Sequence, residues 1–280
     1  MDQNTLLYYD FEPSHTVKAF SSTRISPFPH SEEELKEMGG YAAFNVTDYC
    51  GDAPERVTRN KRWLADELKI DADHIILPRQ THTSHVKVID QQYFDLSPEE
   101  QKAFLHDVDA LITSMPSTCI GISTADCVPV LIYDIKSRLC AAIHAGWRGT
   151  VQHIVRQTAL LMQQMGATAD TMYAVIGPSI SLQSFEVGEE VVEAFELNGF
   201  DTASIVSRSI SVPSSQHTST PPRPHIDLWA ANSMELEEAG LPLAHIQVCG
   251  ICTYQHADTF FSARRLGIHS GRIFSGIMMP

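Results

Sequence analysis

Three short segments of the chain combine residue types that bind transition metals. They are Arg79-Gln80-Thr81-His82, Thr124-Ala125-Asp126-Cys127 and His144-Ala145-Gly146-Trp147-Arg148-Gly149. One cysteine and two histidines form a ligand set that Zn²⁺ prefers, and three protein ligands leave a fourth position for water or substrate. We therefore take His82, Cys127 and His144 as candidate ligands of a catalytic zinc. The alternative is a buried thiol and two ordinary histidines, because only the fold can bring together residues so far apart in the sequence.

The segment that begins at His144 also predicts an anion site. A strand that ends near Ile143 leads through a Trp and an Arg, flanked by glycines, into a helix expected from Gly149. The first N–H groups of a helix lack partners and carry the positive end of its dipole, so they attract anions. Arg148 would add a bidentate contact to a phosphate or carboxylate. The alternative is a tight turn with the Arg148 side chain in solvent.

Composition limits the classes of protein to which the chain can belong. It has 280 residues, of which 43% are hydrophobic and 19% charged, as in folded globular proteins. It carries 20 Lys and Arg against 34 Asp and Glu, and the net charge of −14 has the wrong sign for binding nucleic acid or an anionic membrane. The longest apolar run, Val128 to Tyr133, is far shorter than the roughly 18 residues of a membrane-spanning helix. No leader pattern is visible at the N-terminus, so we expect a cytoplasmic protein.

The remaining cysteines do not suggest a disulfide framework in a chain of this length and expected compartment. Cys249-Gly250-Ile251-Cys252 is a lone C-x-x-C motif, and without a second pair we interpret it as structural. Cys119 and Cys140 lie in apolar runs and are expected in the core. Cys50 has no assigned role.

The candidate ligands lie near the ends of predicted strands. Short apolar runs predict strands at 74–77, 85–89, 108–113, 119–122, 128–133, 139–143, 171–176, 245–249 and 272–278. Apolar residues at helical spacing predict helices at 54–68, 149–165, 188–197 and 227–239. This succession predicts an α/β or α+β fold.

Residues 1–280 are expected to form a single domain, because neither repeats nor a linker divide the sequence. A Ser-, Thr- and Pro-rich stretch at 201–225 predicts a surface loop within that domain. It is not interpreted as a linker, since patterned sequence resumes for only about 55 residues after it.

The same segments carry a family resemblance. The motifs in chain order are Gln80-Thr81-His82, Thr124-Ala125-Asp126-Cys127-Val128-Pro129, His144-Ala145-Gly146-Trp147-Arg148-Gly149, Ile176-Gly177-Pro178, Phe185-Glu186-Val187-Gly188, Asp227-Leu228-Trp229 and Phe261-Ser262-Ala263-Arg264-Arg265. Together they resemble the signatures of the YfiH-like laccase-domain family over nearly the whole chain. The chain departs from that pattern in a Ser26-Pro27-Phe28-Pro29-His30 insertion.

The resemblance implies both a fold and a metal site. Members are similar in being single-domain α/β/β/α layered folds, related to cysteine hydrolases, that hold zinc through His, Cys and His. In this chain the ligands would be His82, Cys127 and His144. The resemblance also implies phosphorolysis of adenosine, inosine, guanosine and methylthioadenosine, together with deamination of adenosine.

Four residues are then candidate substrate contacts. Arg148 and Arg24 would bind phosphate, Asn45 would contact the ribose or phosphate, and Phe185 would stack on the base. The alternatives are that Asn45 is a turn amide and that Phe185 packs in the core.

The label polyphenol oxidase, which the family also carries, fits the residues less well. Multicopper oxidases commonly bind copper through His-x-His pairs, and the 13 histidines here form none. Phosphorolysis needs an anion site and deamination an activated water, which the Arg148 turn and an open zinc position would supply. We therefore expect a zinc-dependent purine nucleoside phosphorylase with adenosine deaminase activity, whose partners are a purine nucleoside and phosphate.

Other functions stay open at this point. Cys127 with His144 as its base would make a Cys–His hydrolase or amidase, including one that edits cell-wall precursors. Zinc content separates the two, because a thiolate that binds metal is not free to attack. A binding protein with a vestigial site is the non-enzymatic alternative. Copper in place of zinc also stays open, since the Irving–Williams order favours Cu²⁺ at such ligands.

Overall fold

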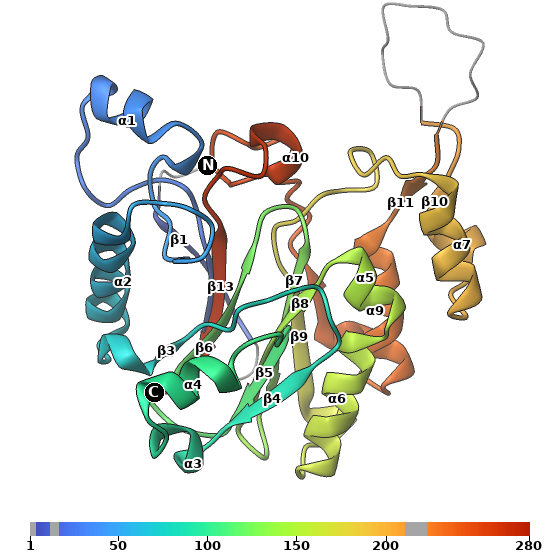
Figure 1. Ribbon diagram of the computed structural model, residues 1–280. Helices are drawn as coiled ribbons and strands as arrows, with labels where there is room; N and C mark the ends of the chain where they lie inside the picture. The colour runs from blue at the N-terminus through green and yellow to red at the C-terminus, as the bar shows by residue number, and fades with distance from the viewer. Residues whose placement is uncertain (1–3, 12–16, 211–222) are drawn as a thin grey trace, which may run out of the picture.

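Two mixed β-sheets form the centre of the structure, a computed structural model that describes residues 4–11, 17–210 and 223–280 (Figure 1). The first sheet has the order β1 (Leu6–Tyr9), β2 (Lys18–Ser22), β13 (Ile273–Met278), β6 (Cys119–Thr124) and β3 (Ile75–Ile76). The second has the order β12 (Ile246–Val248), β9 (Met172–Ile176), β7 (Val128–Asp134), β8 (Leu139–Ala145), β5 (Ala110–Thr113) and β4 (Val86–Ile89). A separate two-stranded sheet contains β10 (Val206–Ser207) and β11 (His225–Ile226).

The two large sheets pack against each other because their central strands are apolar on both faces. Leu131 of β7 shares a core with Ile120 and Ile277 of the first sheet. Val130 and Ile132 of the same strand belong to a second core on the opposite face. Successive side chains of a strand point to opposite faces, so a continuous apolar run is the pattern of a strand buried on both sides.

Helices cover the outer face of each large sheet (Figure 1). The helices are α1 (Glu32–Met38), α2 (Pro54–Leu68), α3 (Gln91–Phe94), α4 (Pro98–Phe104), α5 (Trp147–Val151), α6 (Ile154–Gln164), α7 (Glu189–Leu197), α8 (Thr202–Ile205), α9 (Leu228–Glu238) and α10 (Ala263–Leu266). Leu64 and Leu68 of α2 pack with Phe20 and Phe274 on the first sheet. Helices α6, α7 and α9 pack on the second sheet. This order of helix, sheet, sheet and helix confirms the predicted α/β/β/α layers.

Every predicted strand has a counterpart that differs by a few residues at its ends, and β1, β2, β10 and β11 are additional. The prediction of one continuous helix over 149–165 is wrong, because α5 and α6 are separate helices. His153 lies between them in the left-handed region with φ of 60°. Its Nδ1 lies 2.8 Å from the Glu235 carboxylate of α9, and its ring stacks on Phe200 at 5.2 Å. Contacts with distant residues accompany the break in a helix whose apolar pattern is continuous.

The stretch predicted as a surface loop at 201–225 has secondary structure at both ends. Helix α8 and strand β10 follow its first residue, and its last residue belongs to β11. Residues 211–222 of this stretch lie outside the described residues. The loop interpretation therefore needs correction at the two ends.

In the described part of the chain, no helix combines the length and apolar character needed to span a membrane. The longest of these helices, α2, has 15 residues and is polar on one side, where Arg59 and Arg62 lie. The cytoplasmic location stays a prediction.

Candidate metal centre

The three predicted ligands lie together where β6 ends, β7 begins and β8 ends. His82 is in the loop between β3 and β4, Cys127 is in the turn between β6 and β7, and His144 is in β8. Their ligating atoms all lie within 4.8 Å of one another, and the group could hold a metal ion. The fold therefore brings together residues that are far apart in the sequence, as the metal hypothesis requires.

The pairing of β7 with β8 places Cys127 beside His144. Pro129 pairs with His144, and Val128 pairs with Ala145, in antiparallel register. Cys127 directly precedes Val128, so the ladder that begins there holds the thiol at the end of β8. Each residue of this pair of strands is buried, which keeps the frame of the site rigid.

Gly146 allows the backbone to pass close to two of the ligands. A Cβ atom at this position would lie 2.9 Å from Sγ of Cys127 and 3.1 Å from Cδ2 of His82. Contacts this short are not tolerated without a shift of the neighbouring atoms. The glycine that the motif indicated as part of a turn is therefore required by close packing against the site.

Asp109, which was not among the predicted site residues, links His144 to His82. Its Oδ1 lies 2.7 Å from Nδ1 of His144 and accepts the N–H of His82 at 3.1 Å. Its Oδ2 accepts the N–H and the hydroxyl of Thr83 at 2.8 Å and 2.7 Å. Because Nδ1 of His144 donates to this carboxylate, Nε2 is left to face the site, as in many metal-binding histidines. A charged residue inside the apolar run 108–113 is the sequence signal that could have identified it.

Electrostatic interactions favour a charged form of the site in the metal-free protein. Burial raises the pKa of the Cys127 thiol, but the charge of His144 and hydrogen bonds with His144 and His82 outweigh burial and lower it to about 6. Burial lowers the pKa of His144, but Cys127 and Asp109 raise it to about 9. Burial also opposes ionisation of Asp109, yet its hydrogen bonds bring the pKa to about 2. Cys127 is therefore a thiolate near neutral pH, the form that binds metal.

His82 completes the group from the exposed side. Its Nε2 lies 3.8 Å from Sγ of Cys127, and its ring stands edge-on to that of His144 with 4.8 Å between centroids. Its backbone has φ of 66°, in the left-handed region, and Asp109 accepts its N–H. Since His144 is buried and His82 is exposed, a metal ion or substrate reaches the group from the side of His82.

Asp126 anchors the turn that carries Cys127. It has φ of 90°, and its Oδ1 accepts the hydroxyl of Thr253 at 2.7 Å. Its Oδ2 accepts the N–H of Arg264 at 2.7 Å, and its carbonyl accepts the N–H of Ile180 at 2.9 Å. Through these contacts, Asp126 holds the turn of Cys127 against the segments of Ile180, Thr253 and Arg264.

Two of the predicted substrate contacts, Arg148 and Phe185, differ in exposure. Arg148 is exposed in the five-residue helix α5, and its guanidinium lies 4.3 Å from the ring centroid of Trp147. Phe185 is 8% exposed and belongs to the core that α7 and α9 cover. The guanidinium of Arg264 lies 5.6 Å from the Phe185 centroid, so it covers part of the ring. Binding of phosphate by Arg148 and stacking on Phe185 stay predictions.

The other two predicted contacts are engaged within the protein. Asn45 is fully buried, and its amide donates to Asp52 Oδ2 at 3.0 Å and accepts the N–H of Arg272 at 3.2 Å. Arg24 is half-buried and donates to the carbonyl oxygens of Ala42 and Ala257 at 2.7 Å and 2.6 Å. In this arrangement both side chains hold loops in place, and their contact with a nucleoside or phosphate stays a prediction.

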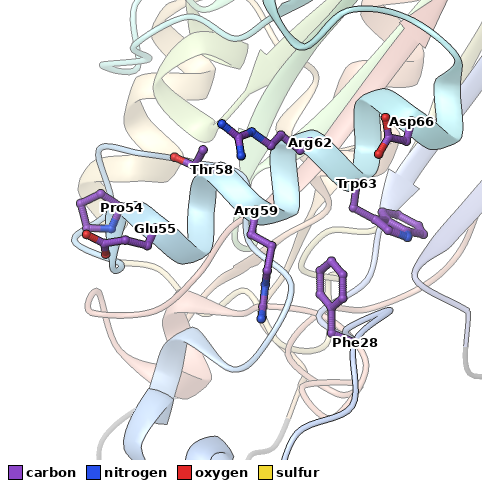
Figure 2. A pocket seen from close by; sticks show the side chains of 8 residues that line it. All are labelled: Phe28, Pro54, Glu55, Thr58, Arg59, Arg62, Trp63 and Asp66. Carbon is purple, nitrogen blue, oxygen red and sulfur yellow. The ribbon is translucent and has the colours of Figure 1, made fainter.

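A pocket of about 580 Å³ lies over α2 and includes none of the predicted site residues (Figure 2). It is lined by Phe28, Pro54, Glu55, Thr58, Arg59, Arg62, Trp63 and Asp66. Phe28 belongs to the predicted insertion at 26–30, and the guanidinium of Arg59 lies 4.3 Å from its ring centroid. The insertion therefore packs on α2 through Phe28.

The donor set fits a zinc ion. One thiolate and two imidazoles are ligands that Zn²⁺ prefers, and the carboxylate behind His144 is the outer partner that such sites commonly have. Among the residues that the structure describes, this is the one group of three His, Cys, Asp or Glu side chains placed to share a metal. The same donors also accept copper, so the group alone does not identify the metal.

Known proteins are similar to this chain in sequence and in fold. Residues 35–280 match the family described as multi-copper polyphenol oxidoreductase laccase. The chain is 48% identical over 260 residues to the purine nucleoside phosphorylase of Bacteroides thetaiotaomicron, which covers 92% of this chain and 93% of that protein. It is 42% identical over 261 residues to adenosine deaminase RL5 of an unknown prokaryotic organism, with 93% of each chain covered.

A solved structure confirms the fold over the full length. YlmD from Geobacillus stearothermophilus matches with a TM-score of 0.83 and 25% identity, over 100% of this chain and 97% of that one. The family match covers the segments that carry His82, Cys127 and His144. The chain therefore belongs to the multi-copper polyphenol oxidoreductase laccase family that its motifs predicted.

Proposed function

We propose that the protein is a zinc-dependent purine nucleoside phosphorylase that also deaminates adenosine. The cluster of His82, Cys127 and His144 carries the proposal, because it offers three ligands and leaves a coordination position for water or substrate. The relatives at 48% and 42% identity, a purine nucleoside phosphorylase and an adenosine deaminase, support a nucleoside substrate. The proposed substrates are adenosine, inosine, guanosine and methylthioadenosine, with phosphate as the second substrate.

The residues of the site have distinct roles in this proposal. Cys127, His82 and His144 would hold the zinc, which when bound supplies Lewis-acid chemistry and lowers the pKa of water. Asp109 keeps the proton of His144 on Nδ1 and so presents Nε2 to the site. The same carboxylate accepts backbone N–H groups of the His82 loop, so it keeps both histidines oriented.

Arg148 is the proposed phosphate contact. Arg148 has an exposed guanidinium and lies two residues after Gly146 in the sequence. The backbone of Gly146 passes next to Cys127 and His82. A phosphate oxygen would attack the anomeric carbon of the ribose. The bond from that carbon to the purine nitrogen breaks, and the base leaves with the electron pair and takes up a proton. In deamination, water would add at C6 of adenosine and ammonia would leave.

Metal content and product analysis test this proposal. The purified protein is expected to contain about one zinc per chain and to release hypoxanthine from inosine only when phosphate is present. Removal of zinc by a chelator should abolish the release, and zinc should restore it better than copper does. Phosphorolysis that persists in fully metal-free protein would contradict the proposal. Hypoxanthine formed without phosphate would show hydrolysis instead.

A copper polyphenol oxidase has less support. Several coppers need several groups of ligands, whereas the described residues include one candidate group of three. The full sequence also has no His-x-His pair among its 13 histidines. Oxygen consumption with a phenolic substrate after loading with copper would favour this alternative over the nucleoside function.

A second candidate, a Cys–His hydrolase or amidase, follows from the charge state of the metal-free site. Cys127, His144 and Asp109 have the order nucleophile, base and orienting carboxylate, and the pKa of the thiol is lowered to about 6. Hydrolysis of an amide in a cell-wall precursor would be one such reaction. Amide hydrolysis by metal-free protein that zinc inhibits would favour this candidate. A requirement for zinc would exclude it.

A further inference from the structure

The three ligands form a triangle, and each of its three edges is a distance between two ligands that contacts within the fold must hold. The edge from Cys127 to His144 is fixed by the ladder between β7 and β8. The edge from His82 to His144 is fixed by Asp109, which accepts hydrogen bonds from both residues. The third edge, 3.8 Å from Nε2 of His82 to Sγ of Cys127, joins a loop to a turn that share no ladder.

Gln80 bridges this third edge. Its Nε2 donates to the carbonyl of Ser123 at 2.8 Å, and its Oε1 accepts the N–H of Ser123 at 2.7 Å. Gln80 shares the loop of His82, and Ser123 lies near the end of β6, just before the turn of Cys127. One side-chain amide thus pairs with both backbone groups of one residue, as a neighbouring strand would.

The surroundings of Gln80 allow only one orientation of its amide. The hydroxyl of Tyr49 donates to Oε1 of Gln80 at 3.2 Å, so Oε1 accepts from two donors while Nε2 faces a carbonyl. Ser123 is 5% exposed, and its hydroxyl bonds with that of Thr47 at 2.5 Å. A flipped amide would place its NH₂ group against the N–H of Ser123. The bridge is therefore a specific contact between the half-buried Gln80 and the buried Ser123.

We infer that Gln80 is a positioning residue that holds the His82 loop on the Cys127 turn and so sets the distance between these two ligands. The inference rests on the proposed metal centre. Gln80 acts through Ser123 and its own loop rather than through a bond to the metal. Without the bridge, the loop of the exposed His82 keeps its hydrogen bonds to Asp107 and Asp109 but loses its tie to the backbone of β6. Part of the binding energy must then be used to order the loop.

Metal affinity of two Gln80 variants tests the inference. Gln80→Met keeps the length of the side chain but removes both hydrogen bonds, and Gln80→Glu keeps one and turns the other into a repulsion with the Ser123 carbonyl. Affinities for Zn²⁺ and Co²⁺ are measured by chelator competition, and the thiolate-to-cobalt absorption band reports how Cys127 binds. Both variants are expected to lose about tenfold in affinity, as for other outer partners of metal ligands, and to shift the cobalt spectrum.

Gln163→Met is the matched control. Gln163 lies on α6 and donates from Nε2 to the carbonyl of Ala239 at 2.7 Å. The substitution therefore removes a similar hydrogen bond, between residues that are distant in the sequence from the three ligands. The control should keep the wild-type affinity and cobalt spectrum. Circular dichroism checks that each variant folds. Should Gln80→Met not fold, the metal affinity and cobalt spectrum of Gln80→Glu test the inference.

The outcomes separate the inference from the function on which it rests. Wild-type affinity and spectrum in both Gln80 variants, even with a lower melting temperature, would show that Gln80 is only structural and overturn the inference. Wild-type protein that binds neither Zn²⁺ nor Co²⁺ would overturn the metal centre, and the role of Gln80 with it.

Discussion

Cys127 and Cys252 lie in neighbouring loops but have different surroundings. Asp126, which precedes Cys127, accepts a hydrogen bond from Thr253, which follows Cys252. Cys127 is partly exposed and stands beside two imidazoles, whereas Cys252 is 3% exposed. Proximity in the fold alone therefore does not make a cysteine part of the metal group.

The two thiols also differ in the cause of their lowered pKa. Burial opposes ionisation of both, but in Cys127 a charged imidazole outweighs it. In Cys252 the pKa is lowered by neutral groups, because its sulfur accepts the N–H of Ser181 at 3.3 Å and lies 3.5 Å from the hydroxyl of Ser184. A nearby charge and access from solvent distinguish a metal-binding thiol from a packed one.

The largest effect is expected from Cys127→Ser. A hydroxyl is a poor zinc ligand compared with a thiolate, so zinc content should fall below detection and phosphorolysis should fall more than about 100-fold. Metal analysis of the purified variant and the inosine assay measure this. Cys252→Ser is the matched control and should keep both properties. Full zinc content in Cys127→Ser would show that the three-residue group does not bind the metal.

The ligands of this group could be predicted from sequence, but their supports could not. The three ligands, His82, Cys127 and His144, belong to distinctive motifs near the ends of apolar runs. Because apolar runs predict strands, these motifs were expected at strand ends, where functional sites are commonly built. Gln80 belongs to the Gln80-Thr81-His82 motif, but the motif does not show that Gln80 bonds to Ser123, because the loop and the strand end meet only in the folded chain. Sequence patterns indicate which residues are unusual, but they do not show what holds them.

The errors in the predicted fold have the same cause. The apolar spacing of Val151, Ile154 and Val155 continues across the break at His153. The contact of His153 with Glu235 joins residues far apart in the sequence, so local spacing does not predict it. The amide of Asn45, a candidate substrate contact, bonds within the protein, and its contact with a substrate stays a prediction. Local spacing predicts the elements well, whereas contacts between distant segments decide where elements break and which polar groups face the site.

Asp109→Asn is expected to have the next largest effect. An amide no longer requires the proton of His144 to be on Nδ1, and it removes the negative charge behind the ligand. Metal affinity should fall about 10- to 100-fold, as measured by chelator competition. Asp107→Asn is the control. Asp107 also bonds to the His82 loop, since it accepts the hydroxyl of Thr81 at 2.9 Å, but the bond to His144 is made by Asp109. Equal losses in both variants would assign the effect to the loop alone.

Alkylation of the metal-free protein should separate the thiols by pH. Iodoacetamide reacts with the thiolate, so modification of Cys127 should rise with pH and reach half its maximum near pH 6, where its pKa lies. Burial raises the pKa of Cys249 to about 11, so this partly exposed thiol should react at least about tenfold more slowly at neutral pH. Mass spectrometry of peptides gives the rates. A midpoint for Cys127 near pH 9, the ordinary pKa of a thiol, would show that the two histidines do not lower its pKa.

Zinc should suppress that reaction at Cys127, because a bound thiolate is not free to attack. The buried Cys252 should stay unmodified with or without zinc. A rate of modification at Cys127 that zinc does not change would indicate that the metal binds elsewhere.

The smallest effect is expected from Cys252→Ser. A buried hydroxyl costs free energy unless it has partners, but the N–H of Ser181 and the hydroxyl of Ser184 are already placed to donate and accept. The free energy of unfolding should therefore fall by only about 1 kcal/mol, as measured by urea denaturation of metal-free protein. Zinc affinity should stay within about twofold of wild type, because neither serine contacts the ligand group. A tenfold loss of zinc affinity would mean that the two cysteines act as one site, and that the difference in their surroundings does not separate their roles.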